Sequence, residues 1–144
     1  MDKIIVSVFI VLCLNILTNC TSVKTDNTPI QREWMLVSFE GFTKDQFIKN
    51  KARINLTAPI EGKKVKGSAF MGCNTMFFTS EFKNNGKVKI SGLGSTMMAC
   101  RNMDLETNFA ATFEKMIRYS VDGHFLTISD DDGHQMKFVA SDWD

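Results

Sequence analysis

Residues 76–91, MFFTSEFKNNGKVKIS, predict two antiparallel strands joined by a tight turn. The first half places Met76 and Phe78 opposite Phe77 across a strand, and the second half alternates valine and isoleucine with lysine. Between them lies Asn84-Asn85-Gly86, and an Asn-Gly pair tolerates the positive φ that a type I′ hairpin turn requires. We therefore expect an antiparallel sheet as the basis of the fold.

Similar short apolar segments, several of them alternating with polar residues, recur on both sides of this hairpin. We expect about eight short strands, over residues 32–40, 52–58, 64–71, 76–83, 87–91, 119–121, 124–129 and 135–140. Residues 44–51 fit either a helical turn or an ordered loop. This order excludes a parallel β-α-β architecture. It favours an α+β fold, a small antiparallel barrel-like sheet with one helix packed on it, because closure removes exposed strand edges.

The one helix is expected over residues 104–118, where apolar side chains recur at helical spacing. Phe109 and Phe113 are placed on its buried face. We expect Asp104 to cap its first turn and Arg118 to suit its last turn.

The N-terminus has the pattern of an export signal. After a cationic start, residues 4–17 are almost free of polar side chains, and as a helix they reach about 21 Å, short of the roughly 30 Å hydrocarbon core. A secretory signal peptide is therefore favoured over a membrane-spanning helix.

The exit of this segment, Leu17-Thr18-Asn19-Cys20, resembles a bacterial lipobox, whose cysteine is acylated and becomes the first mature residue. We expect a lipoprotein signal peptide over 1–19, a lipidated Cys20, a flexible tether over 20–31 and a folded domain over 32–144. Asn19 stands where Ala, Gly or Ser is usual. The alternative is ordinary secretion with cleavage after Ser22.

Cys73 and Cys100 are the cysteines that remain if Cys13 leaves with the signal peptide and Cys20 carries lipid. In an oxidising compartment a disulfide between them is the expected state. The alternative is a pair of buried thiols that serve as small apolar side chains.

Charge is balanced overall but uneven along the chain. The net charge of +1 argues against a nucleic-acid binder. Residues 44–89 carry ten Lys and Arg against three acidic residues, whereas residues 101–144 carry four against nine. The basic segment could form a face for lipid headgroups or an anionic partner. We expect instead that the oppositely charged segments meet as solvent faces of the folded domain.

Several short motifs follow one another in the order of a known family. They are Trp34-x-Leu36, Gly67-x4-Gly72-Cys73-Asn74, Thr96-Met97-x-Ala99-Cys100, Glu106-x2-Phe109, Tyr119 and Gly123-x2-Leu126-x-Ile128. Over residues 32–140 they resemble the META-domain family of HslJ-like proteins. The resemblance implies a small α+β barrel-like domain, often exported and often a lipoprotein. It also implies an association with envelope or heat stress and no established enzymatic activity.

Two constellations contain cysteine and histidine. Cys73 with His124 or His134 as base would make a thiol nucleophile. The same three residues with Cys100 have the ligand types of a zinc site, but lack its paired spacing. No local signature brings them together, so we expect neither site.

A further constellation, Met97, Met98, Cys100 and Met103, has the soft ligands that suit Cu(I). Methionine also fills irregular core space, and core packing is the favoured interpretation. The acidic run at residues 130–133 lacks the further ligands of a calcium loop and is expected to be a solvated turn.

We therefore expect a non-catalytic, monomeric envelope lipoprotein that acts as a stress-related binding or structural module. It is expected to use no metal or cofactor and to bind no nucleic acid. Its partners are the membrane, through its lipid, and an envelope protein or ligand that the sequence does not identify. The rival hypotheses are a periplasmic soft-metal protein and a thiol-dependent enzyme.

Overall fold

The computed structural model describes residues 29–143. The predicted signal peptide, the lipobox and most of the tether lie outside the described residues. The strands are β1 (Glu33–Phe39), β2 (Arg53–Asn55), β3 (Ile60–Glu61), β4 (Lys64–Phe70), β5 (Thr75–Phe82), β6 (Val88–Ser95), β7 (Arg118–Asp122), β8 (Phe125–Ser129) and β9 (Gln135–Ala140), and the helices are α2 (Lys44–Lys49) and α3 (Asp104–Phe113).

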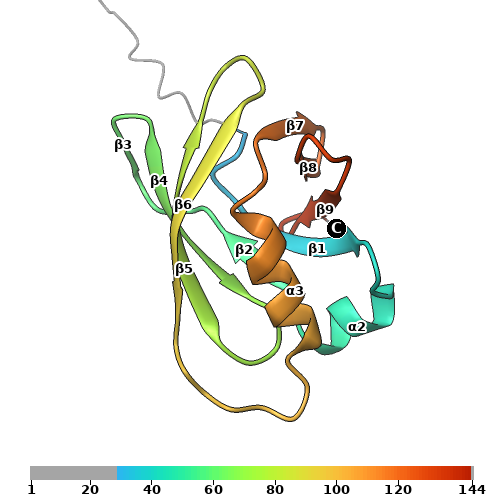
Figure 1. The fold of residues 1–144 in the computed structure, drawn as a ribbon. Helices are drawn as coiled ribbons and strands as arrows, with labels where there is room; N and C mark the ends of the chain where they lie inside the picture. Colours follow the sequence, from blue (N-terminus) through green and yellow to red (C-terminus); the bar gives the residue numbers. More distant parts are fainter. Residues whose placement is uncertain (1–28, 144) are drawn as a thin grey trace, which may run out of the picture.

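The strands form one antiparallel sheet in the order β6-β5-β4-β2-β1-β9-β8-β7, with β3 added beside β4. The sheet curls around α3, which lies between β5–β6 and the β1–β9 part of the sheet (Figure 1). The two edge strands meet only near one end. There the Val88 N–H donates to the Ile117 carbonyl at 2.9 Å, and the Tyr119 N–H donates to the Gly86 carbonyl at 2.8 Å. The predicted barrel is thus a half-barrel with a short seam, richer in β-structure than the α+β prediction suggested.

Helix α3 is shorter than predicted. It begins after Met103, and Asp104 is its first residue rather than its cap, since no side chain caps this helix. After Phe113 the chain leaves the helix, and Arg118 already belongs to β7. The predicted helix was too long because Met116, which continues the apolar spacing, is buried even though it lies beyond the helix.

Helix α2 resolves the ambiguous segment at residues 44–51. Thr43 and Gln46 form a capping box, in which the Gln46 side chain accepts the Thr43 N–H at 2.7 Å. The helix buries Phe47 in the core. The structure therefore contains a second helix beside the one that the periodicity predicted.

The predicted hairpin at residues 76–91 is present, but its turn differs from the prediction. Three residues, Asn84–Gly86, separate Lys83 from Lys87, whose backbones are hydrogen bonded at 2.8 Å. Gly86 has φ +75°, and Asn85 is not among the residues with positive φ. A two-residue type I′ turn needs positive φ at both central positions, so this loop is of the three-residue kind.

A single hydrophobic cluster fills the concave side of the sheet. Trp34 is fully buried, and its indole N–H donates to the Ile30 carbonyl at 3.0 Å. Phe109 and Phe113 of α3 stack with ring centroids 4.6 Å apart, and Phe113 meets Phe78 edge-on at 4.8 Å. The helix is therefore packed by its aromatic stripe, as the sequence predicted. No helix in the described part of the chain has the length and apolar character needed to cross a membrane.

Candidate functional site

Asn74 is the centre of a buried polar network at one end of the sheet. Its side-chain oxygen accepts hydrogen bonds from the Thr96 hydroxyl at 2.8 Å and the Met98 N–H at 2.7 Å. Its side-chain nitrogen donates to Glu106 at 2.8 Å and to the Met98 carbonyl at 3.2 Å. Its backbone N–H donates to the other oxygen of Glu106 at 2.6 Å. The segment after β6 is thereby tied to both the sheet and α3.

A disulfide between Cys73 and Cys100 lies beside this network, with Cα atoms 6.1 Å apart. The two halves of the family motif, residues 72–74 and 96–100, are therefore one assembly. Met97 and Ala99 are exposed, and Met97 is 98% exposed. The geometry gives this assembly a structural task, which is to hold the segment between β6 and α3 in place.

Removal of the Glu106 carboxylate should destabilise the domain. In Glu106→Ala, two buried donors of Asn74 lose their acceptor, which we expect to cost about 2–3 kcal/mol of unfolding free energy. Glu114 is the matched control, because it also accepts a backbone N–H, that of Leu93 at 3.0 Å, but is exposed. Denaturant unfolding should show a loss below about 1 kcal/mol for Glu114→Ala, since water replaces the carboxylate. Equal losses in the two variants would contradict a buried network.

The disulfide bears on three of the chemical hypotheses. A cysteine in a disulfide offers no thiolate to a substrate or a metal. Cys73 is therefore not a nucleophile in this state, and the zinc and Cu(I) constellations lose their thiolate ligands.

Met97 and Met98 are exposed rather than packed in the core, which corrects the packing interpretation for these two residues.

His134 is hydrogen bonded to Asp130 rather than directed toward Cys73. Its Nδ1 lies 2.7 Å from the Asp130 carboxylate, whose other oxygen accepts the N–H groups of Asp132 at 3.0 Å and His134 at 2.9 Å. Burial alone would raise the pKa of Asp130, but the hydrogen bonds and charge of His134 hold that pKa below its ordinary value. The hydrogen bond to Asp130 raises the pKa of His134. Asp130 is thus a buried turn residue, and the predicted solvated acidic turn is wrong at this position.

Asp130, Asp132 and His134 also present three ligand atoms within 4.8 Å of one another. Both carboxylate oxygens of Asp130 already accept hydrogen bonds within the turn. These hydrogen bonds close the turn between β8 and β9.

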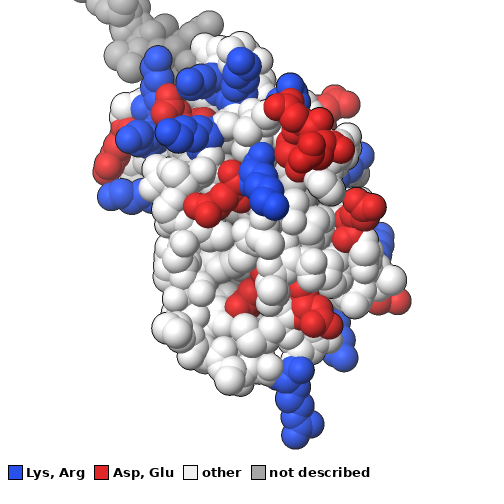
Figure 2. Space-filling view, in the orientation of Figure 1, with Lys and Arg blue, Asp and Glu red and all other residues white. Residues whose placement is uncertain are grey.

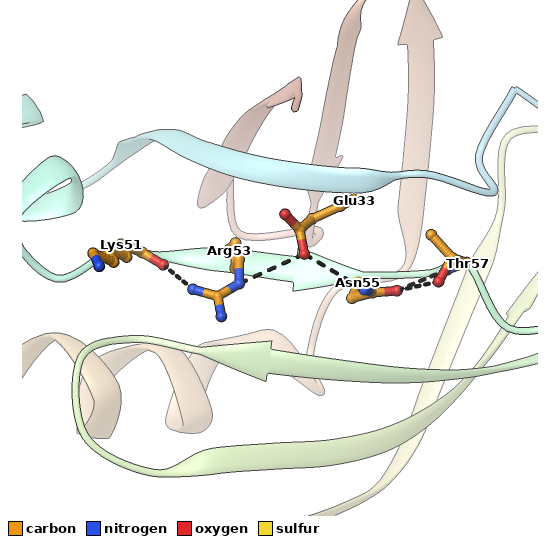
Figure 3. A network of polar contacts seen from close by, with 5 residues as sticks. All are labelled: Glu33, Lys51, Arg53, Asn55 and Thr57. Carbon is orange, nitrogen blue, oxygen red and sulfur yellow. Dashed lines mark hydrogen bonds and ion pairs between the residues drawn. The ribbon is translucent and has the colours of Figure 1, made fainter. Parts of the chain in front are cut away.

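A second polar network lies on the outer side of β1 and β2 (Figure 3). Glu33 is 3.6 Å from Arg53 and accepts a hydrogen bond from Asn55 at 3.5 Å. Asn55 also accepts two hydrogen bonds from Thr57, at 2.7 and 2.9 Å. These contacts join neighbouring strands, and the hydrogen bonds between Asn55 and Thr57 turn the chain just after β2, so the predicted strand over 52–58 is shorter in the structure.

A pocket of about 660 Å³ opens at the end of the sheet where the β3–β4 and β5–β6 hairpins turn. Its apolar lining comes from Ile30, Ile60, Val65 and Phe82. Its polar lining comes from Gly62, Lys63, Lys83, Asn84 and Asn85. The pocket therefore combines an apolar wall with positive charge and amide groups.

Positive charge gathers at the end of the sheet where this pocket lies. We define the basic end as the six exposed lysines of the two hairpins, Lys63, Lys64, Lys66, Lys83, Lys87 and Lys89. Lys and Arg side chains gather over the same hairpins in the space-filling view (Figure 2). Within residues 29–143, no ion pair joins a lysine of segment 44–89 to an acidic residue of segment 101–144. The two charged segments nevertheless meet along the seam between β6 and β7, where Lys87 pairs with Arg118 in an isolated β-bridge and Asp131 lines the same hollow as Lys87 and Lys89.

Comparison with known proteins identifies the fold and the family. A family model described as the META domain matches residues 27–143. None of the curated proteins compared gives a significant match.

Three solved structures share the fold. An NMR structure of a protein from Burkholderia xenovorans has a TM-score of 0.62 and 21% identity, and covers 78% of this chain and 83% of its own. A second NMR structure has a TM-score of 0.55 and 20% identity, and covers 78% of this chain and 91% of its own. A crystal structure of a DUF4847 family protein from Bacteroides vulgatus has a TM-score of 0.53 and 13% identity, and covers 83% of this chain and 99% of its own.

Proposed function

Because the chain belongs to the META domain family, we propose that it is a non-catalytic, lipid-anchored module of the bacterial envelope. In this proposal, Cys20 carries the lipid, and the domain binds a partner or ligand at the membrane under envelope stress. The family supports an envelope-associated, non-catalytic module. The lipid, the export and the stress role are the parts that we add.

The observation that carries the proposal is the disulfide between Cys73 and Cys100 in a chain that begins with an export-like segment. Disulfides persist in oxidising compartments and are rare in the cytosol of ordinary cells. A disulfide is therefore more consistent with an exported domain than with a cytosolic one. The four residues Leu17–Cys20 add the resemblance to a lipobox.

The non-catalytic part of the proposal is supported by the contacts of the candidate catalytic and metal-ligating side chains. Cys73 and Cys100 are bridged, and His134 is hydrogen bonded to Asp130. His124 stacks on Trp143 with ring centroids 5.0 Å apart. These contacts give each candidate residue a structural role.

The test is acylation at Cys20. Expressed in bacteria, the unaltered chain should incorporate a palmitate analogue and partition into detergent, because two or three acyl chains suffice for stable anchoring. Cys20→Ala should do neither. Cys13→Ala is the matched control and should label like the unaltered chain, since Cys13 leaves with the signal peptide. A Cys20→Ala protein that stays membrane-bound without label would mean that the N-terminal apolar segment is retained, and would overturn the proposal.

A further inference from the structure

We propose that the basic end is a membrane-docking surface that binds the anionic phospholipid headgroups of a bilayer. The inference extends the proposed function by orienting the domain, since it brings this end rather than another against the membrane. The positions of the lysines carry it, and these do not depend on whether Cys20 is lipidated.

Strand pairing brings the lysines to one surface. Lys64 lies directly opposite Glu81 on β5, and Glu81 lies directly opposite Lys89 on β6. Directly opposite residues in an antiparallel pair project to the same side of a sheet. Lys83 and Lys87 flank the turn of the same hairpin. β4, β6 and the turn between β5 and β6 thus contribute lysines to one surface.

The surface keeps a clear excess of positive charge. Within the two hairpins the acidic residues are Glu61 and Glu81, against six lysines. Lys66 and Glu61 are 3.9 Å apart, but both side chains are more than 70% exposed. Such exposed pairs contribute little and are easily exchanged for other partners. The other five lysines form no ion pair within residues 29–143, although Asp131, itself paired with Arg118, lies beside Lys83, Lys87 and Lys89.

The pocket adds a place for an individual headgroup at the same end of the sheet, on the face opposite to Lys64 and Lys89. Lys63 and Lys83 line it together with Asn84 and Asn85, which supply ammonium and amide donors to a phosphate. Its apolar wall includes Ile60, which is 36% exposed. A phospholipid presents the same combination, a charged phosphate next to an apolar glycerol ester and acyl chain.

The chain leaves the described domain at this same end. Ile30 lines the pocket and lies ten positions after Cys20 in the sequence. Ten positions span at most about 33–36 Å even in a fully extended chain. A lipid on Cys20 would therefore keep the basic end near the bilayer. Proximity matters because salt screens charge beyond about 8 Å at physiological ionic strength.

The test uses a chain that begins at Thr21 and so carries no lipid. Residues 29–143 contain the whole sheet, both helices and the hydrophobic cluster, so this chain keeps the contacts of the fold. Its binding to vesicles of phosphatidylglycerol mixed with phosphatidylcholine is measured by sedimentation. Binding should be weak with phosphatidylcholine alone. It should also fall steeply as the salt concentration rises from about 0.15 M to about 0.5 M.

The charge variants make the test specific. Each lysine near an anionic leaflet strengthens binding about fivefold, so Lys63→Gln with Lys83→Gln should weaken it about 25-fold. The matched control replaces Lys44 and Lys49 by Gln on α2, which lies away from the two hairpins (Figure 1), and should change binding less than about twofold. All four positions are exposed, so both variants should keep the unfolding midpoint of the parent.

Three results with vesicles would overturn the docking surface. They are equal binding to neutral and anionic vesicles, no binding of the unaltered domain to anionic vesicles, and equal losses in the two double variants. Saturable binding of a soluble short-chain phospholipid without vesicle binding would reassign the pocket to a free ligand and also overturn the proposal. None of these results bears on acylation of Cys20, so failure here is distinct from failure of the lipoprotein proposal.

Discussion

Replacing Phe109 or Phe113 by alanine is expected to lower the unfolding free energy by about 3–5 kcal/mol. Both side chains are essentially fully buried, stack on each other and attach α3 to the sheet through Phe78. Each truncation leaves a cavity where the helix crosses the curled sheet. Because small domains have only about 5–15 kcal/mol of stability, either change removes a large share of it.

Denaturant unfolding of the two variants beside Phe77→Ala provides the measurement. Phe77 is adjacent to Phe78 on β5 but is 55% exposed, so its truncation should cost less than about 1 kcal/mol. The comparison separates the loss of a core ring from the loss of any ring. Losses below about 1 kcal/mol at both Phe109 and Phe113 would show that α3 is not docked through this stripe.

Reduction of the bond between Cys73 and Cys100 should lower stability by about 2–4 kcal/mol. The bond spans 27 residues of sequence, so it restricts the unfolded chain considerably. It also holds the segment between β6 and α3, whose amide protection against hydrogen exchange should fall on reduction. The network around Asn74 continues to hold that segment, which keeps the folded state accessible without the bond.

Non-reducing digestion and mass spectrometry of the exported protein should recover one peptide pair joined at these cysteines. The control for reduction is a Cys73→Ser, Cys100→Ser double variant, whose denaturant midpoint should not respond to reductant. Recovery of both peptides as separate alkylated thiols from the oxidising compartment would refute the bridge. So would equal midpoints for the oxidised and reduced protein.

The sequence predicted strands best where a strand has one buried and one exposed face. The last strand, β9, has the predicted bounds, and its buried residues alternate with exposed ones. β2 is shorter than predicted, although Ala52 and Leu56 on either side of it still share backbone hydrogen bonds with the β1 segment. The hydrogen bonds of the Asn55 side chain to Thr57 turn the chain after Leu56, a local choice that alternation does not reveal. α3 was predicted too long because tertiary contacts bury Met116 outside the helix.

The candidate sites depended more strongly on contacts that are distant in the sequence. Asn74 and Glu106 are 32 positions apart, and both belong to the family motifs, but no local pattern states that they meet. The excess of lysine in segment 44–89 could be read from the composition of that segment. Its concentration at one end required the pairing of β4, β5 and β6. The capping box at Thr43 was the signal that would have identified α2.

The pairing of β1 with β9 has a consequence for the order of events during synthesis. β1 lies between β2 and β9, so it has a neighbouring strand on both sides only once residues 135–140 have emerged from the ribosome. Until then one edge of β1 is open, and the hydrophobic cluster lacks Met136 and Phe138. Contacts this far apart in sequence slow folding, because a long loop must close before they contribute. The complete sheet and its hydrophobic cluster therefore form only after the last strand has been synthesised.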